Sequence, residues 1–147
     1  MTNEAAVAVL AGSKSDQTVV QDVTKTLEEM GATYDLQYIS AHRNPEALRE
    51  YVSTSKAKVF IGIAGLAAHL PGVIASATTR PVIGVPVAVK LGGLDSLLSI
   101  VQMPSGVPVA AVGIDNARNA AVLAAEILAL SDPEIAARLD AMRRSWR

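Results

Sequence analysis

The chain has 147 residues, which suits one domain of ordinary size and leaves little room for a second. Half of the residues are hydrophobic, the net charge is −1 and cysteine is absent, so disulfides and thiolate metal sites are excluded and no nucleic acid partner is expected. No run of about 18 apolar residues is free of charges or turn residues, and no basic cluster precedes an apolar core at the N-terminus. We therefore expect a cytoplasmic protein with no membrane segment, whose excess of apolar surface is buried between copies of the chain.

Short apolar runs typical of buried strands alternate with segments in which apolar residues recur at helical spacing. In chain order, this pattern predicts strand 6–11, helix 19–30, strand 34–39, a helix from Pro45, strand 59–64, helix 66–77, strand 81–85, helix 94–102, strand 107–112, helix 116–130 and a last helix from Pro133 to near Trp146. The segment 86–93 is the one long irregular loop of this pattern, and we consider it a candidate flap.

Strands that alternate with helices imply a parallel sheet with helices on both faces. The predicted fold is therefore α/β, a flavodoxin-like three-layer αβα sandwich with a five-stranded parallel sheet and an extra C-terminal helix, in a single domain over residues 1–147. Ligands of such sheets bind beyond the carboxyl ends of the strands. Four segments with glycine, hydroxyl or charged side chains follow predicted strands there, at residues 12–16, 40–43, 65–72 and 90–95.

The first of these segments has the residues of an anion-binding turn. Gly12 allows a tight turn, and Ser13 and Ser15 offer hydroxyl groups beside the positive end of the next helix. The alternative is a plain helix cap, because serine and aspartate are preferred there. Arg43 favours the anion site, since a guanidinium can bind a phosphate through two hydrogen bonds. Asp16 is either a charge at a helix start or an acceptor for ribose hydroxyls.

The chain has only two histidines, and histidine is the side chain whose ordinary pKa lies nearest neutrality. His42 stands beside Arg43 and a predicted helix start, both of which favour the neutral imidazole that can accept a proton. We therefore take His42 as the candidate catalytic residue. For His69, an orienting or capping role and a contact with substrate remain open. Two histidines without a clear carboxylate partner are a poor ligand set, so no metal site is expected.

Four motifs now point to a family. Gly-Ser-Lys-Ser-Asp at 12–16, Ser-Ala-His-Arg-Asn-Pro at 40–45, Ala-Ala-His-Leu-Pro-Gly at 67–72 and the segment 94–106 occur in the order in which they are found in the N5-carboxyaminoimidazole ribonucleotide mutases of purine biosynthesis. The chain resembles that family over roughly residues 5–135. The resemblance implies the sandwich fold predicted above and an octamer. In that octamer the last helix, about residues 133–146, packs on a neighbouring subunit, and Ile135, Leu139 and Met142 are the candidate contacts.

The resemblance also implies a reaction without ATP, biotin, metal or any other cofactor. The carbamate on the exocyclic nitrogen of a ribonucleotide is lost as carbon dioxide in a closed pocket and recaptured by carbon 4 of the imidazole, while one histidine transfers the proton. The histidine that matches is His42. The other residues that the resemblance places in the site are Ser13, Ser15 and Arg43 at the phosphate, Asp16 at the ribose, Gly65, Ala67 and His69 around the migrating carboxylate, and Gly12, Ser40, Ala41 and Leu70 as further substrate contacts.

Two alternatives stay open. A sister class, the aminoimidazole ribonucleotide carboxylases, uses free carbon dioxide. Its members usually carry lysine after the second motif's histidine and Arg-Ser-Asn in the third motif, so Arg43 and the Ala-Ala-His-Leu-Pro stretch favour the mutase. A non-catalytic, flavodoxin-like nucleotide-binding module fits composition and periodicity equally well, but it has no need of the two histidine motifs. Lys90 lies in the candidate flap, and the resemblance gives no reason to expect a cation there.

Overall fold

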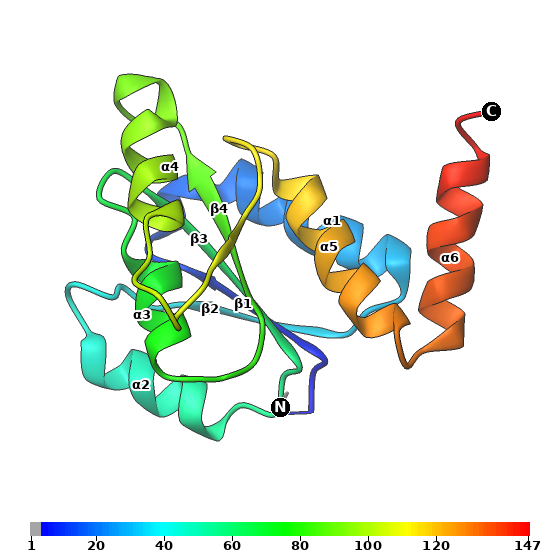
Figure 1. The fold of residues 1–147 in the computed structure, drawn as a ribbon, viewed down its shortest axis with the longest axis horizontal. Coiled ribbons are helices and arrows are strands. Elements are labelled where there is room, and N and C mark those ends of the chain that lie inside the picture. The colour runs from blue at the N-terminus through cyan, green and yellow to red at the C-terminus, as the bar shows by residue number, and fades with distance from the viewer. Residues whose placement is uncertain (1–3) are drawn as a thin grey trace.

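A computed structural model describes residues 4–147, so the first three residues of the predicted domain lie outside it. Five parallel strands form one sheet in the order β2-β1-β3-β4-β5, and β1 to β4 are labelled in Figure 1. The strands are β1 (Val7–Ala11), β2 (Tyr34–Tyr38), β3 (Val59–Gly65), β4 (Val82–Val87) and β5 (Ala110–Ala111). This order is that of flavodoxin-like sheets, and the predicted fold class is confirmed.

Helices cover both faces of the sheet (Figure 1). The helices are α1 (Gln17–Met30), α2 (Pro45–Thr54), α3 (Leu70–Ser76), α4 (Leu94–Val101), α5 (Ala117–Ala129) and α6 (Pro133–Arg144), with short 3₁₀ helices η1 (Lys14–Asp16) and η2 (Leu91–Gly93). Alternate residues of each strand point to opposite faces, so the central strands feed two cores. One core lies under α1, α5 and α6, and the other lies under α2 and α3.

Two glycines of the central strands bring α3 and α4 close to the sheet. A Cβ built on Gly84 would lie 2.5 Å from Cγ2 of Ile100 in α4, and one on Gly62 would lie 3.1 Å from Cγ of Pro71 in α3. Any larger residue at these positions would push a helix away from the sheet. The two buried strands β3 and β4 therefore have glycine at the positions where a helix packs directly on the strand backbone.

Differences between the predicted elements and the structure lie at the ends of elements. The helix expected from residue 66 begins at Leu70, because Leu66 has a positive φ of 58° and Pro71 suits only the first turn of a helix. The strand expected over 107–112 is reduced to Ala110–Ala111, since Pro108 has no N–H for a ladder. The last helix ends at Arg144, before Trp146. Pro86 and Val87, expected in the irregular loop, belong to β4.

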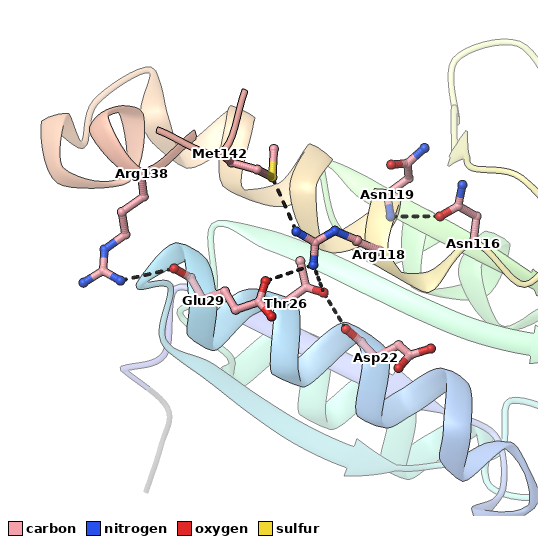
Figure 2. Close-up of polar contacts among 8 residues, drawn as sticks. All are labelled: Asp22, Thr26, Glu29, Asn116, Arg118, Asn119, Arg138 and Met142. Carbon is pink, nitrogen blue, oxygen red and sulfur yellow. Dashed lines mark hydrogen bonds and ion pairs between the residues drawn. The ribbon is translucent and has the colours of Figure 1, made fainter. Parts of the chain in front are cut away.

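The C-terminal helix packs on its own chain. Ile135 and Leu139, expected to contact a neighbouring subunit, are buried in the core with α1 and α5. Arg118 of α5 joins the three helices: its Nη1 donates to Oε2 of Glu29 in α1 at 2.9 Å, and its Nη2 lies 3.6 Å from Sδ of Met142 (Figure 2). That apolar face of α6 is therefore not available to a neighbour, and contact of another face of α6 with a second subunit stays a prediction.

Candidate functional site

A cavity of about 500 Å³ opens at the carboxyl edge of the sheet, where the loops after β1, β2 and β3 meet. Every residue that the resemblance placed in the site lines it: Gly12, Ser13, Ser15, Asp16, Ser40, Ala41, His42, Arg43, Gly65, Ala67, His69 and Leu70. The fourth segment expected at this edge, residues 90–95, does not line it. The segments are up to about fifty residues apart in sequence, and they converge because parallel strands end at one edge. Ala64, Leu66 and Val89 complete the lining and were not predicted.

A second, larger hollow of about 1070 Å³ lies at the opposite edge, where β4 begins, and contains none of the predicted residues. Its one charged residue, Arg80, is already engaged. Nη1 of Arg80 donates to the carbonyls of Ser55 and Ala57, each at 2.7 Å, and Nη2 donates to that of Val52 at 3.0 Å. This guanidinium therefore satisfies the carbonyls at the end of α2, and we assign the site to the smaller cavity.

The turn after β1 combines capping with a cluster of hydroxyl groups. Oγ of Ser13 accepts a hydrogen bond from the backbone N–H of Ser15 at 3.3 Å, so Ser13 caps the 3₁₀ helix η1. The two serine hydroxyls lie 2.5 Å apart. Asp16 makes no side-chain cap bond to α1. The capping alternative is thus correct for Ser13, and both serines nevertheless line the cavity.

Arg43 ties the turn after β2 to the turn after β1. Its Nη2 donates to the carbonyl of Gly12 at 3.4 Å, and its Nε donates to Oγ of Ser40 at 3.3 Å. The same Ser40 oxygen accepts the backbone N–H of Arg43 at 3.2 Å. A guanidinium has five N–H donors. The two side-chain contacts orient the group beside Ser13 and Ser15 and leave donors for an anion in the cavity.

His42 and His69 are in direct contact. Nε2 of His42 lies 2.6 Å from Nδ1 of His69, and the two rings are nearly perpendicular, with an interplanar angle of 84°. Only one proton can occupy this hydrogen bond, so the tautomers of the two rings are coupled: when one nitrogen carries the proton, the other must accept it. The sequence placed both residues at the site but did not predict this pairing, which fits the orienting role left open for His69.

A second carboxylate stands close to Asp16. Burial of the Asp16 side chain is the main factor that raises its pKa above the ordinary value of 3.8, and the negative charge of Asp115 raises the pKa further. Asp115 lies on the loop between β5 and α5 and has a left-handed φ of 60°. Asp115 was not among the predicted site residues, because an aspartate directly before the Asn116 cap of α5 gives no signal other than that of a helix start.

The candidate flap reaches the site through one side chain. Val89 lines the cavity and lies over Gly65, where a Cβ would be only 2.7 Å from Cγ2 of Val89. Gly65 is therefore needed for the close approach of this segment.

Among residues 4–147, no three histidine, aspartate or glutamate side chains are grouped as a metal site would need. No helix in the described part of the chain combines the length and apolar character needed to cross a membrane.

The order of the strands defines a flavodoxin-like α/β protein, and the cavity at the switch point of its sheet is the candidate small-molecule site. Comparison with known proteins is more specific. The model of the AIR carboxylase family matches residues 6–147, and the chain belongs to this family.

Named relatives agree over nearly the whole chain. The N5-carboxyaminoimidazole ribonucleotide mutase of Methanocaldococcus jannaschii is 55% identical over 141 residues, which cover 96% of this chain and 90% of that protein. The protein of the same name from Thermotoga maritima is 51% identical, over 90% of this chain and 80% of that one. A crystal structure of Treponema denticola PurE matches with a TM-score of 0.84 and 33% identity, over 95% of this chain and 89% of that one.

Proposed function

We propose that this protein is an N5-carboxyaminoimidazole ribonucleotide mutase, an isomerase that forms 4-carboxy-5-aminoimidazole ribonucleotide in purine biosynthesis. The observation that carries the proposal is the hydrogen-bonded pair His42–His69 inside a cavity that also holds Ser13, Ser15 and Arg43. The relatives from Methanocaldococcus jannaschii and Thermotoga maritima carry the name of this mutase, which favours it over a carboxylase that uses free carbon dioxide.

The cavity suits a phosphorylated ribonucleotide. Ser13, Ser15 and Arg43 hold the phosphate, because hydroxyl groups and a guanidinium are donors that match its oxygens. Asp16 accepts hydrogen bonds from the ribose hydroxyls. Gly65, Ala67 and His69 surround the migrating carboxylate, and Gly12, Ser40, Ala41 and Leu70 form the remaining contacts. The imidazole ring of the substrate then lies between the turn after β1, which holds the phosphate, and the side chains of His42 and His69.

The reaction conserves every atom of the substrate. The bond between the exocyclic nitrogen and the carboxylate carbon breaks as His42 donates a proton to that nitrogen, and carbon dioxide stays in the cavity. Carbon 4 of the ring then forms a bond to carbon dioxide, and His42 removes the proton that carbon 4 carried. His42 thereby regains the proton it gave up, so the reaction consumes neither ATP nor biotin and uses no metal. His69 holds the ring of His42 through their shared hydrogen bond, which keeps one nitrogen of His42 directed at the substrate.

Two assays test the proposal. Purified protein is given the carbamate ribonucleotide in one assay, and aminoimidazole ribonucleotide with bicarbonate in the other. The mutase converts the carbamate without a lag and gains nothing from added bicarbonate. Turnover only in the assay with aminoimidazole ribonucleotide and bicarbonate would identify the carboxylase instead. Binding without turnover in both assays would identify a non-catalytic module.

We also propose that the protein works as a homo-octamer in the cytoplasm. Support for assembly comes from α4, whose outer face carries Leu94, Leu98 and Val101 at positions i, i+4 and i+7, all about half exposed. Leu91, just before this helix, is 78% exposed. An apolar stripe of this kind is typical of a surface that is covered by a second protein copy.

A further inference from the structure

The segment after β4 closes one side of the cavity. Residues 88–93 connect β4 to α4 and are called the 88–93 segment below. Val89 of this segment lines the cavity and lies against Gly65, so closely that a Cβ on Gly65 would be 2.7 Å from Cγ2 of Val89. The position of the 88–93 segment therefore determines how well the cavity is closed beside the third motif.

Asp115 holds the start of this segment at two points. Its backbone N–H donates to the carbonyl of Pro86 at 2.8 Å, and its Oδ1 accepts the backbone N–H of Ala88 at 2.9 Å. These two bonds lie beyond the regular pairing of β5 with β4. The last bond of that pairing runs from the N–H of Val112 to the carbonyl of Gly84, at 3.2 Å. The carboxylate thus stands where a strand carbonyl would stand, and extends the ladder by one bond beyond β5.

The local sequence fits this arrangement. Pro86 has no N–H, so β4 offers no hydrogen-bond donor toward β5 at the point where β5 has diverged. The next N–H on this edge of the strand is that of Ala88. The left-handed φ of Asp115 is a conformation that aspartate adopts more readily than most residues. On the other side of the segment, the buried hydroxyl of Ser96 donates to the carbonyl of Val87 at 2.8 Å. Ala88 is therefore anchored by Asp115, directly before Val89.

We propose that Asp115 is a positioning residue, whose carboxylate holds the 88–93 segment so that Val89 closes the cavity against Gly65. The inference rests on the mutase function proposed above, because that reaction frees carbon dioxide before carbon 4 recaptures it. An opening beside Val89 lets carbon dioxide leave. The exocyclic nitrogen then keeps the proton it takes from His42, His42 is reprotonated by water, and aminoimidazole ribonucleotide accumulates as a by-product.

Two variants of Asp115 separate the hydrogen bond from the charge. Asp115→Asn keeps an oxygen acceptor and tolerates the left-handed backbone, but it removes the charge that acts on Asp16. Asp115→Gly removes both and permits the same φ. We expect Asp115→Gly to raise the ratio of aminoimidazole ribonucleotide to mutase product about tenfold or more, and Asp115→Asn to stay within about twofold of the parent. An unchanged ratio in Asp115→Gly, or equal leakage in both variants, would overturn the proposal.

A second measurement needs no substrate. Hydrogen exchange of the Ala88 amide, followed by NMR, is expected to accelerate about tenfold or more in Asp115→Gly and to change little in Asp115→Asn. Val89→Ala is the matched control, because it opens the cavity and leaves the Ala88 hydrogen bond intact: it should leak carbon dioxide with normal exchange at Ala88. If Asp115→Gly does not fold, protection of the Ala88 amide in the parent still tests the bond, and rapid exchange there would refute it. A parent protein that fails to convert the carbamate would refute the proposed function and not the Ala88 result.

Discussion

The hydrogen bond between His42 and His69, 2.6 Å long, joins two rings that line the cavity and couples their tautomers. Neither ring has a carboxylate as its orienting partner in this bond, which differs from the histidine of a Ser-His-Asp triad. One ring donates in this hydrogen bond and the other accepts, so the tautomer of each ring fixes that of the other. At the scale of the residue, we expect turnover to depend on which ring holds the proton when substrate is bound.

His42→Asn is expected to reduce turnover of the carbamate about 100-fold or more, because asparagine is polar but cannot carry a proton. Binding of aminoimidazole ribonucleotide, measured by calorimetry, should be nearly unchanged. His69→Asn keeps an acceptor close to the position of Nδ1 and is expected to lose less activity. More than a tenth of the parent turnover in His42→Asn would show that another group moves the proton.

Arg43→Ala is expected to weaken binding of phosphorylated ligands by about 1.5–3 kcal/mol, the range for hydrogen bonds to charged groups. The dephosphorylated nucleoside should bind almost as before, and Arg43→Lys should recover part of the loss because it keeps the charge without the planar fork. Calorimetry with both ligands decides the matter. Equal losses for nucleotide and nucleoside would mean that Arg43 acts only through its bonds to Gly12 and Ser40.

Asp16 predicts a dependence of stability on pH. Burial, and then the charge of Asp115, raise the pKa of Asp16 in the folded protein above 3.8, so its ionised form is disfavoured by folding. Its contribution to stability is complete below pH 3.8 and is lost as the pH rises through the folded pKa. Asp16→Asn should therefore raise the melting temperature at pH 7, and the gain should shrink as the pH falls toward 3.8. A gain that is constant with pH would contradict this assignment.

At the scale of the element, close contact of helices with glycines in the strands decides how the site is built. Gly84 allows α4 to pack on β4, and Gly62 does the same for α3, which begins directly after His69. The 88–93 segment runs from β4 to α4, so the packing of α4 also bears on Val89. The packing of α3 and α4 on the sheet thus sets the distance between the third motif, residues 67–72, and the 88–93 segment.

Gly84→Ala is expected to destabilise the protein by about 1–3 kcal/mol, because its Cβ would lie 2.5 Å from Cγ2 of Ile100 and 3.3 Å from Pro71. Gly113→Ala is the control, since its Cβ would meet Cβ of Asn116 at an ordinary 3.6 Å. Denaturant unfolding of both variants measures the difference. Similar free energies of unfolding for the two would show that α4 can shift without cost.

At the scale of the whole molecule, the described chain has an apolar stripe on α4 that no other part of it covers. The stripe lies on the helix that follows the 88–93 segment, so a neighbouring copy on α4 would stand close to the cavity. The apolar composition expected from the sequence to be buried between subunits is thus found partly on one helix face. Ile135 and Leu139 of α6 are already used inside the chain.

Light scattering is expected to report a particle of eight times the chain mass of 15.3 kDa. Leu98→Lys places a charge in the middle of the stripe and should reduce that mass. Leu130→Lys is the matched control, because Leu130 is an exposed leucine at the end of α5, 89% exposed and outside the stripe. A parent that scatters as a monomer, or dissociation by Leu130→Lys but not by Leu98→Lys, would contradict assembly through α4.

The sequence by itself determined the fold class, the order of strands and helices and, through the motifs that it shares with a known family, the site residues that the structure brings to one cavity. The fold follows from local patterns: buried strands are continuous apolar runs, and parallel strands leave their motifs at one edge. Only the tertiary structure decided the contact of His42 with His69, the role of Asp115 at Ala88, and the side on which α6 packs. Each of these joins segments distant in the chain, and their partners depend on helix packing and on backbone turns with positive φ, as at Leu66 and Asp115, which composition and periodicity do not encode.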